Sequence, residues 1–165
     1  MMKLFLSIII LSMTVTTGFA QATAEKIYNP TADAKANIAD LVKRAAKEKK
    51  NVFIMAGGNW CSWCMEFNRF TKADPQIDSI FKADYLIYHL NYSPENKNLA
   101  VFANLGYPQR FGFPNFIILD ENGNRLHTQN SAYLEQGKSY NRVKVIEFLK
   151  GWNRAAYSPA AFNTK

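Results

Sequence analysis

The sequence predicts an α/β domain in which helices flank both faces of a central mixed β-sheet. Short apolar runs that favour strands alternate along the chain with segments whose apolar residues follow helical spacing. One such run directly precedes the two cysteines of the chain, Cys61 and Cys64. A strand–turn–strand pattern then comes before a final helix. A length of 165 residues with 48% hydrophobic residues is enough for one domain with a substantial core.

Residues 1–20 have the pattern of a secretory signal peptide. Lys3 gives a short basic start, residues 4–15 are mostly apolar, and Gly18-Phe19-Ala20 offers small residues for cleavage. We expect cleavage after Ala20, with Ala22 as a second candidate. An uncleaved anchor is the alternative, but the run is interrupted by Ser and Thr and is shorter than the ~20 residues of a membrane span. The protein is therefore expected to be exported, periplasmic or secreted, with no stable membrane insertion afterwards.

Residues 21–32 are predicted to be an extended lead-in, with a short edge strand near Ile27-Tyr28, and residues 33–165 to form the domain. The domain begins with an amphipathic helix capped by Thr31 or Asp33. Its apolar positions are Ala34, Ile38, Leu41, Val42 and Ala45. The wholly apolar run 52–55 then predicts a strand buried on both faces, at the centre of the sheet.

The helix after the cysteines is predicted to run to about Phe70. Pro75, which suits a first helical position, starts a further helix through Phe81. Residues 85–90 form the next predicted strand, apolar on both faces apart from its ends and parallel to 52–55. A polar loop at 93–98 and a short helix at 99–105, ended by Gly106, complete this part.

The remaining elements are a hairpin and a last helix. Strands at 116–119 and 125–127 flank the turn 120–123. A loop follows to Tyr140, and a helix begins near Arg142. Its predicted apolar stripe is Val143, Ile146, Leu149 and Trp152.

The formal net charge of +7 does not by itself predict a nucleic-acid partner, and none is expected. The basic residues are scattered or gather at 43–44 and 47–50, near the end of the first helix, where positive charge complements the helix dipole.

The spacing Cys-x-x-Cys at a strand-to-helix junction predicts a dithiol/disulfide redox site. Cys61 is expected at the positive N-terminal end of the helix, where backbone N–H groups favour a thiolate, and Cys64 one turn inside. We therefore expect Cys61 to attack a substrate disulfide and Cys64 to resolve the mixed disulfide, with no cofactor besides this redox-active pair. No cation lies between the cysteines, which favours a mild, reducing potential. Trp60 and Trp63 are predicted to form an apolar rim that contacts substrate, although core packing is the alternative for at least one of them.

These residues resemble the thioredoxin superfamily. The segment Trp60-Cys61-Ser62-Trp63-Cys64 resembles its Trp-Cys-x-x-Cys motif, and Gly112-Phe113-Pro114-Asn115-Phe116 resembles its Gly-x-Pro-Thr segment. The resemblance covers roughly residues 33–152. The Asp74-Pro75 step is most similar to exported members, including the periplasmic C-terminal domain of the membrane thiol-disulfide transporter.

The resemblance implies a cis Phe113-Pro114 peptide packed against the cysteines, with a backbone edge that binds the substrate chain. Phe113 and Pro114 are therefore candidate substrate-binding residues. The alternative is that Pro114 only caps the entrance to an edge strand. Two positions depart from the family: Met55 stands where reducing members have a buried Asp, and Met65 where they often have Lys. These departures favour a narrower partner, and Glu66 is not expected to carry the missing proton.

Other assignments of the pair are open to test. Structural zinc requires four ligands, and only His89 and His127, expected at strand ends, could add to the cysteines, so no metal is predicted. Arg110 could favour the Cys61 thiolate, although a solvated loop arginine is the simpler interpretation.

The predicted function is an exported protein-disulfide oxidoreductase, expected to be a monomer. It would exchange with protein thiols or disulfides and with an unidentified redox partner. The alternatives are a thioredoxin-like binding module with a structural disulfide, and a dedicated reductant in cytochrome maturation.

Overall fold

The computed structural model describes residues 25–163. The predicted signal peptide, both cleavage candidates and the first residues of the lead-in lie outside these residues, so those interpretations stay predictions. Among residues 25–163, no helix is long and apolar enough to cross a membrane.

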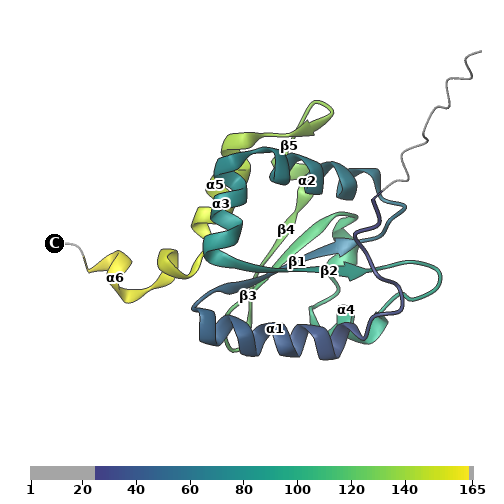
Figure 1. Ribbon diagram of the computed structural model, residues 1–165, viewed down its shortest axis with the longest axis horizontal. Helices are drawn as coiled ribbons and strands as arrows, with labels where there is room; N and C mark the ends of the chain where they lie inside the picture. The colour runs from purple at the N-terminus through teal and green to yellow at the C-terminus, as the bar shows by residue number, and fades with distance from the viewer. Residues whose placement is uncertain (1–24, 164–165) are drawn as a thin grey trace, which may run out of the picture.

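A four-stranded mixed sheet forms the centre of the domain, as predicted (Figure 1). Its strand order is β2-β1-β3-β4, and β1 (Asn51–Gly57) pairs parallel with β2 (Tyr85–Asn91) and antiparallel with β3 (Asn115–Leu119). Every residue of β1 is buried. A strand buried on both faces needs apolar side chains at successive positions, and the run 52–55 supplies them.

The helices divide between the two faces of the sheet (Figure 1). On one face pack α2 (Ser62–Ala73), α3 (Pro75–Asp84) and α5 (Arg142–Gly151), whose buried side chains meet Phe53, Met55 and Phe116. On the other face pack α1 (Ala34–Glu48) and α4 (Leu99–Asn104), against Val52, Ile54 and Ile117. Successive residues of β1 thus serve opposite layers of core.

The ends of the first helices follow the predicted caps. Asp33 caps α1, its carboxylate accepting from Ala36 N at 3.0 Å. Asp74 caps α3, with Pro75 in the first turn, and separates it from α2. Helix α2 runs three residues beyond the predicted end at Phe70.

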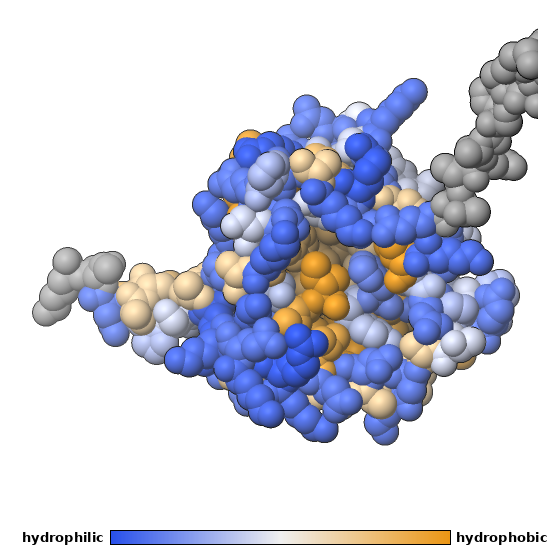
Figure 2. Space-filling model, viewed as in Figure 1, coloured by the Kyte–Doolittle hydropathy of each residue, from blue (hydrophilic) through white to orange (hydrophobic). Residues whose placement is uncertain are grey.

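Strand β2 lies at the edge of the sheet and pairs parallel with β1, as predicted. One of its apolar side chains, Ile87, is 45% exposed. The strand borders a hollow of about 400 Å³ between α1 and the α2–α3 pair, lined by residues such as Phe81, Leu86 and Ile87. Figure 2 shows this apolar area in a largely hydrophilic surface.

The C-terminal half contains the predicted hairpin and one that was not predicted. Strand β3 pairs with β4 (Arg125–Asn130) across the turn, and Gly123 has a positive φ of 82°. A short helix, η2 (Ser131–Leu134), then leads into the two-residue strands β5 (Glu135–Gln136) and β6 (Ser139–Tyr140). This second hairpin occupies the segment predicted to be a loop.

The predicted stripe of α5 is wrong at its first position. Val143 is 58% exposed, and the helix instead buries Val145, Phe148 and Leu149. Ile146 and Trp152 pack at the margin of the same core. The sheet selects Val145 over Val143, although both are apolar, because Val145 lies on the face that packs into the core.

The two ends of the described chain are held to the domain. The lead-in forms no strand at Ile27-Tyr28, contrary to expectation, but Tyr28 is buried. At the other end, η3 (Arg154–Tyr157) and α6 (Pro159–Phe162) follow α5. The Asn51 side chain, at the start of β1, donates to Trp152 O at 2.9 Å and accepts from the Tyr157 hydroxyl at 2.9 Å.

Candidate active site

The two cysteines lie where β1 leads into α2, as predicted. Cys61 is the N-cap of α2, and its Sγ accepts a hydrogen bond from Cys64 N at 3.2 Å. The first N–H groups of a helix have no partner inside the helix, so they favour an acceptor or an anion at this position. Cys64 lies one turn inside the helix and is fully buried, whereas Cys61 is 5% exposed.

The cysteines form a disulfide, with an Sγ–Sγ distance of 2.13 Å and Cα atoms 5.2 Å apart. The glycine that ends β1 provides the space for it. A Cβ on Gly57 would lie 2.4 Å from Cys64 Sγ, closer than two such atoms can approach. Strand β1 therefore ends in the one residue type whose backbone can lie against the buried sulfur.

The Phe113-Pro114 peptide is cis, as the resemblance implied. Asn115, the next residue, pairs with Ala56 in β1, so Pro114 lies at the same end of the sheet as Gly57. The Phe113 ring meets the Trp60 ring edge to face, with centroids 5.5 Å apart. The two sequence motifs therefore come together in space.

The two tryptophans differ in their surroundings. Trp60 is 57% exposed, and its Nε1 donates to Tyr92 O at 2.7 Å, which fixes the ring beside Phe113. The Tyr92 and Phe113 rings are 5.0 Å apart. Trp63 is partly buried against the core, where its ring meets Tyr140 edge to face. Trp60 thus has the exposure expected of a rim residue, and Trp63 has a packing contact.

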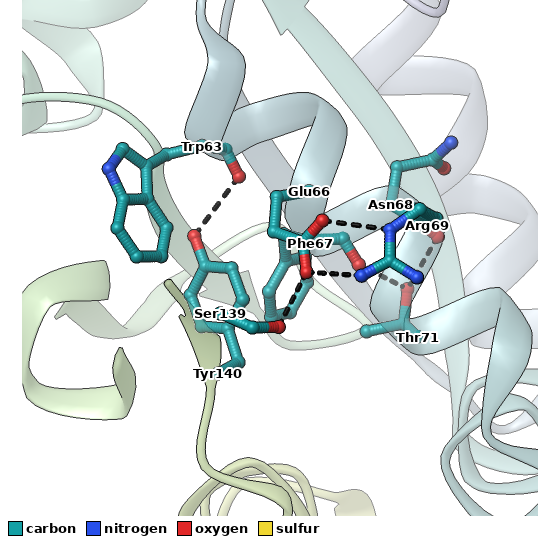
Figure 3. Close-up of polar contacts among 8 residues, drawn as sticks. All are labelled: Trp63, Glu66, Phe67, Asn68, Arg69, Thr71, Ser139 and Tyr140. Atoms are coloured by element: carbon teal, nitrogen blue, oxygen red, sulfur yellow. Dashed lines mark hydrogen bonds and ion pairs between the residues drawn. The ribbon is translucent and has the colours of Figure 1, made fainter. Parts of the chain in front are cut away.

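Helix α2 is joined to the β5–β6 hairpin by polar contacts (Figure 3). The Tyr140 hydroxyl donates to Trp63 O at 3.1 Å, and Ser139 Oγ donates to the Glu66 carboxylate at 2.5 Å. Arg69 donates to both Glu66 oxygens, at 2.8 and 2.6 Å. These bonds, first from Arg69 and then from Ser139, lower the pKa of Glu66, so it remains an ionised acceptor and is no proton carrier.

Met55 is buried in β1 between His89 of β2 and Phe116 of β3. His89 lies within its strand, as does His127, so the expectation that both are strand-end residues is wrong. Burial lowers the pKa of His89 to about 4, with Lys72 as a further cause, and its ring meets Tyr28 at 5.5 Å. His127 stacks on Trp152 at 4.3 Å.

Other predicted groups have local roles. Arg110 donates to Gly106 O and Tyr107 O of its own loop, and its guanidinium lies 4.2 Å from the centroid of the Phe111 ring. Within residues 25–163, no three His, Cys, Asp or Glu side chains gather in a way that could hold a metal ion.

Sequence reasoning missed Tyr28 and Asn59 at this site. Asn59 accepts from Ile27 N and Tyr28 N, both at 3.1 Å, and donates to Tyr28 O at 2.9 Å. A side-chain amide can satisfy a passing backbone in this way because it carries both donor and acceptor. The available signs were an aromatic residue in a polar lead-in and an asparagine just before the motif, neither of which specifies the other.

Known proteins are similar to this chain in sequence and in fold. The thiol:disulfide interchange protein DsbD of Pectobacterium atrosepticum is 30% identical over 112 residues, which are 67% of this chain and 18% of that protein. DsbD of Haemophilus influenzae is 27% identical over 92 residues, 53% of this chain. The matched segments span only 15–18% of the length of these relatives.

Two solved structures share the fold at low sequence identity. A disulphide isomerase from Xylella fastidiosa superposes with a TM-score of 0.68 at 16% identity, covering 78% of this chain and 97% of that one. The oxidised C-terminal domain of DsbD from Neisseria meningitidis superposes with a TM-score of 0.52 at 20% identity. The superposition covers 74% of this chain and 97% of that one.

The family model of the thioredoxin-like domain matches residues 38–137, a span that holds the cysteine pair, the cis-proline segment and the strands that bring them together. This chain therefore belongs to the thioredoxin-like domain family.

Proposed function

We propose that this protein is an exported thiol–disulfide oxidoreductase that reduces disulfides of protein substrates through Cys61 and Cys64. The position of Cys61 carries the proposal. Its sulfur caps α2 and accepts the Cys64 N–H, so the groups that would stabilise a thiolate are already aimed at it. The name of the relatives, thiol:disulfide interchange protein, describes the same chemistry.

In the proposed cycle, the Cys61 thiolate attacks one sulfur of a substrate disulfide. The Cys61–substrate bond forms as the substrate S–S bond breaks, and the leaving substrate thiolate takes a proton from water. Cys64, as a thiolate, then attacks Cys61 Sγ. The Cys61–Cys64 disulfide forms and the second substrate thiolate leaves, so two electrons pass from the protein to the substrate. A second thiol partner must reduce the pair again.

The exposed aromatic surface beside the pair supports protein substrates. Trp60 and Phe113 lie edge to face next to the cis proline, and Trp60 is largely exposed. In the proposal these residues and Pro114 contact the substrate chain, while Trp63 chiefly supports the helix through Tyr140. The reducing direction is favoured by the absence of a charged residue between the cysteines, since cations there stabilise the thiolate that makes a strong oxidant.

Export is proposed from the first twenty residues of the sequence. Outside the cytosol thiols are open to oxidation, so a pair that works as a reductant must be kept reduced by its partner. The mature chain is proposed to begin after Ala20.

Trapping of mixed disulfides tests the proposal. Cys64→Ser removes the resolving thiol, so covalent complexes between Cys61 and substrates should accumulate. The full sequence is expressed, free thiols are blocked in acid, and complexes are separated without reductant. Cys61→Ser is the matched control, because Cys64 is fully buried and should capture nothing. Mass spectrometry of the captured material identifies partners and the mature N-terminus.

The outcomes separate the candidate functions. Several partners that depend on Cys61 support a reductase with protein substrates. A single dominant partner with a haem-attachment motif would indicate the narrower role in cytochrome maturation. An absence of complexes with Cys64→Ser, or equal capture by Cys61→Ser, rejects the proposal in favour of a binding module with a structural disulfide.

A further inference from the structure

The Tyr28 hydroxyl lies beside the buried Cys64 sulfur. Both atoms face the Cα of Gly57, since a Cβ there would be 2.4 Å from Cys64 Sγ and 2.7 Å from the Tyr28 hydroxyl oxygen. The sum of these distances, 5.1 Å, is the greatest separation that the two atoms can have. Tyr28 is 3% exposed and Cys64 is fully buried, so both groups lie inside the core.

Tyr28 is held in this place by the loop that carries the cysteines. Three hydrogen bonds join the Asn59 side chain to the backbone of Ile27 and Tyr28, at 2.9 to 3.1 Å. Asn59 is two residues before Cys61. The His89 ring supports the tyrosine from β2. The position of the hydroxyl is therefore fixed relative to the disulfide, although Tyr28 and Cys61 are 33 positions apart in the sequence.

The hydroxyl has no hydrogen-bond partner among the described residues while the disulfide is formed. An unpaired buried hydroxyl is unfavourable, and most such groups in proteins find a partner. A disulfide sulfur is a weaker acceptor than a thiolate, which carries a negative charge. Reduction would therefore create a strong acceptor, the Cys64 thiolate, next to the unpaired Tyr28 hydroxyl.

The groups around the hydroxyl leave it to act only as a donor. Burial, and then Tyr140, raises the pKa of Tyr28 above its usual range, so the O–H stays protonated. His89 is neutral near pH 7 because its pKa is lowered to about 4. Glu25 and Lys72 form an exposed ion pair beyond His89, and Met55 adds no charge from β1.

We infer that Tyr28 donates a hydrogen bond to the Cys64 thiolate of the reduced protein and so activates the resolving thiol. The inference rests on the proposed function. It gives the Cys64 thiolate a stabilising donor in a site where Met55 stands in place of a buried acid, and it assigns no proton transfer to Tyr28. Tyr28 donates a hydrogen bond and keeps its proton. The Cys64 proton passes to water before attack, after which the Cys61–Cys64 bond forms and the substrate leaves as a thiolate that water protonates.

Tyr28→Phe tests this role, because it removes the hydroxyl and keeps the ring. Tyr85→Phe is the matched control: Tyr85 is also a buried tyrosine of raised pKa, but its hydroxyl donates to Leu149 O at 2.6 Å, away from the cysteines. The Cys64 pKa is read from the Cys64 ¹³Cβ shift of the reduced protein. Tyr28→Phe should raise it by roughly one to two units, the size expected for loss of a hydrogen bond to a charged group. Tyr85→Phe should leave it unchanged.

The pH dependence of the resolving step distinguishes this role from a structural one, because the effect of Tyr28→Phe on the rate should reverse between low and high pH. Reduced protein is mixed with an aromatic disulfide that releases two coloured thiols in turn, the second by attack of Cys64. A thiolate of higher pKa is scarcer below its pKa but more nucleophilic above it. Per unit of pKa shift, Tyr28→Phe should therefore be about threefold slower at low pH and about threefold faster at high pH. A purely structural defect would slow the step at every pH.

A measurement on the unaltered protein covers the case in which Tyr28→Phe does not fold. Reduction above the Cys64 pKa should shift the Tyr28 ¹³Cζ resonance and leave that of Tyr85 in place. If that resonance does not move, or if a folded Tyr28→Phe protein keeps the Cys64 pKa and the rate profile of the wild type, the inference is wrong while the exchange activity stands. If the wild type releases no coloured thiol, the proposed function itself fails.

Discussion

Gly57 ends the central strand with its Cα against two side chains that have little freedom to move. The Cys64 sulfur is fixed by the disulfide, and Tyr28 is fixed by Asn59. A side chain at this position has no space, because its Cβ would approach both atoms to less than 3 Å. At the scale of single residues, the site therefore depends on the absence of a Cβ at position 57.

We predict that Gly57→Ala lowers the free energy of unfolding of the oxidised protein by about 1–3 kcal/mol, the usual cost of overfilling a packed core. Urea denaturation followed by circular dichroism measures it. Gly151→Ala is the control, because a Cβ there meets nothing within 4 Å and Ala favours the helix. Equal midpoints for Gly57→Ala and the wild type would contradict the packing described for the disulfide.

The sequence predicts the residues of the site that belong to local patterns. Cys61, Cys64 and Trp60 follow from a motif of five residues, and the cis Phe113-Pro114 peptide from a second motif. It does not predict the Asn59–Tyr28 contact, because two residues 31 positions apart meet through a coil that has no periodicity. The substrate-binding roles of Trp60, Trp63, Phe113 and Pro114 stay predictions.

At the scale of elements, Asp74 joins three helices. Its carboxylate accepts from Gln76 N at 3.0 Å and Ile77 N at 3.1 Å, which caps α3 directly after α2 ends. Arg142, the first residue of α5, donates to the same carboxylate at 2.5 Å. The Arg142 bond, followed by the Ile77 bond, lowers the pKa of Asp74.

Asp74→Ala is expected to cost about 1–2 kcal/mol near neutral pH, mostly from the lost cap. Because its pKa is lowered on folding, Asp74 stabilises the protein above the unfolded value of about 4 and loses this effect as pH falls through the folded value. The difference in urea midpoint between wild type and variant should thus be constant near neutrality and shrink below about pH 4. Asp40→Ala, which removes an exposed partner of Lys43 and no cap, should change the midpoint little at any pH.

Elements with strong local determinants are predictable, and those set by packing are not. The break between α2 and α3 follows from Asp74-Pro75, whose side chain and ring both favour a helix start. The buried stripe of α5 is ambiguous, because Val143 and Val145 are both apolar and only the sheet selects Val145. Strands β5 and β6 have two residues each, too few for any alternation to be visible.

At the scale of the whole molecule, stability is concentrated on the central strand. Phe53 of β1 is 1% exposed and touches the rings of Phe67, Phe81, Tyr85, Phe116 and Phe148. Its partner in register on β2 is Ile87, which is 45% exposed. The two neighbours thus mark the centre and the edge of one sheet.

We expect Phe53→Ala to lower the free energy of unfolding by about 3–5 kcal/mol, since it opens a cavity among five aromatic rings. Ile87→Ala, its neighbour across the ladder, should cost less than about 1 kcal/mol. Chemical denaturation of both variants under one set of conditions decides this. Similar losses for the two would mean that the edge of the sheet is as well packed as its centre. The layered α/β architecture itself was predictable, because the alternation of strands and helices leaves few other arrangements.

The opposite ends of β1 contact different parts of the molecule. Gly57, at one end, lies against the disulfide, while Asn51, at the other, binds the segment that leads through η3 to α6. A seven-residue strand spans about 20 Å. A fluorophore, affinity handle or surface tether on α6 would therefore follow the segment bound at the end of β1 that is opposite the sulfurs. Such a label gives an immobilised or fluorescent form of the protein in which the aromatic surface around Trp60 stays free for capture of its partners.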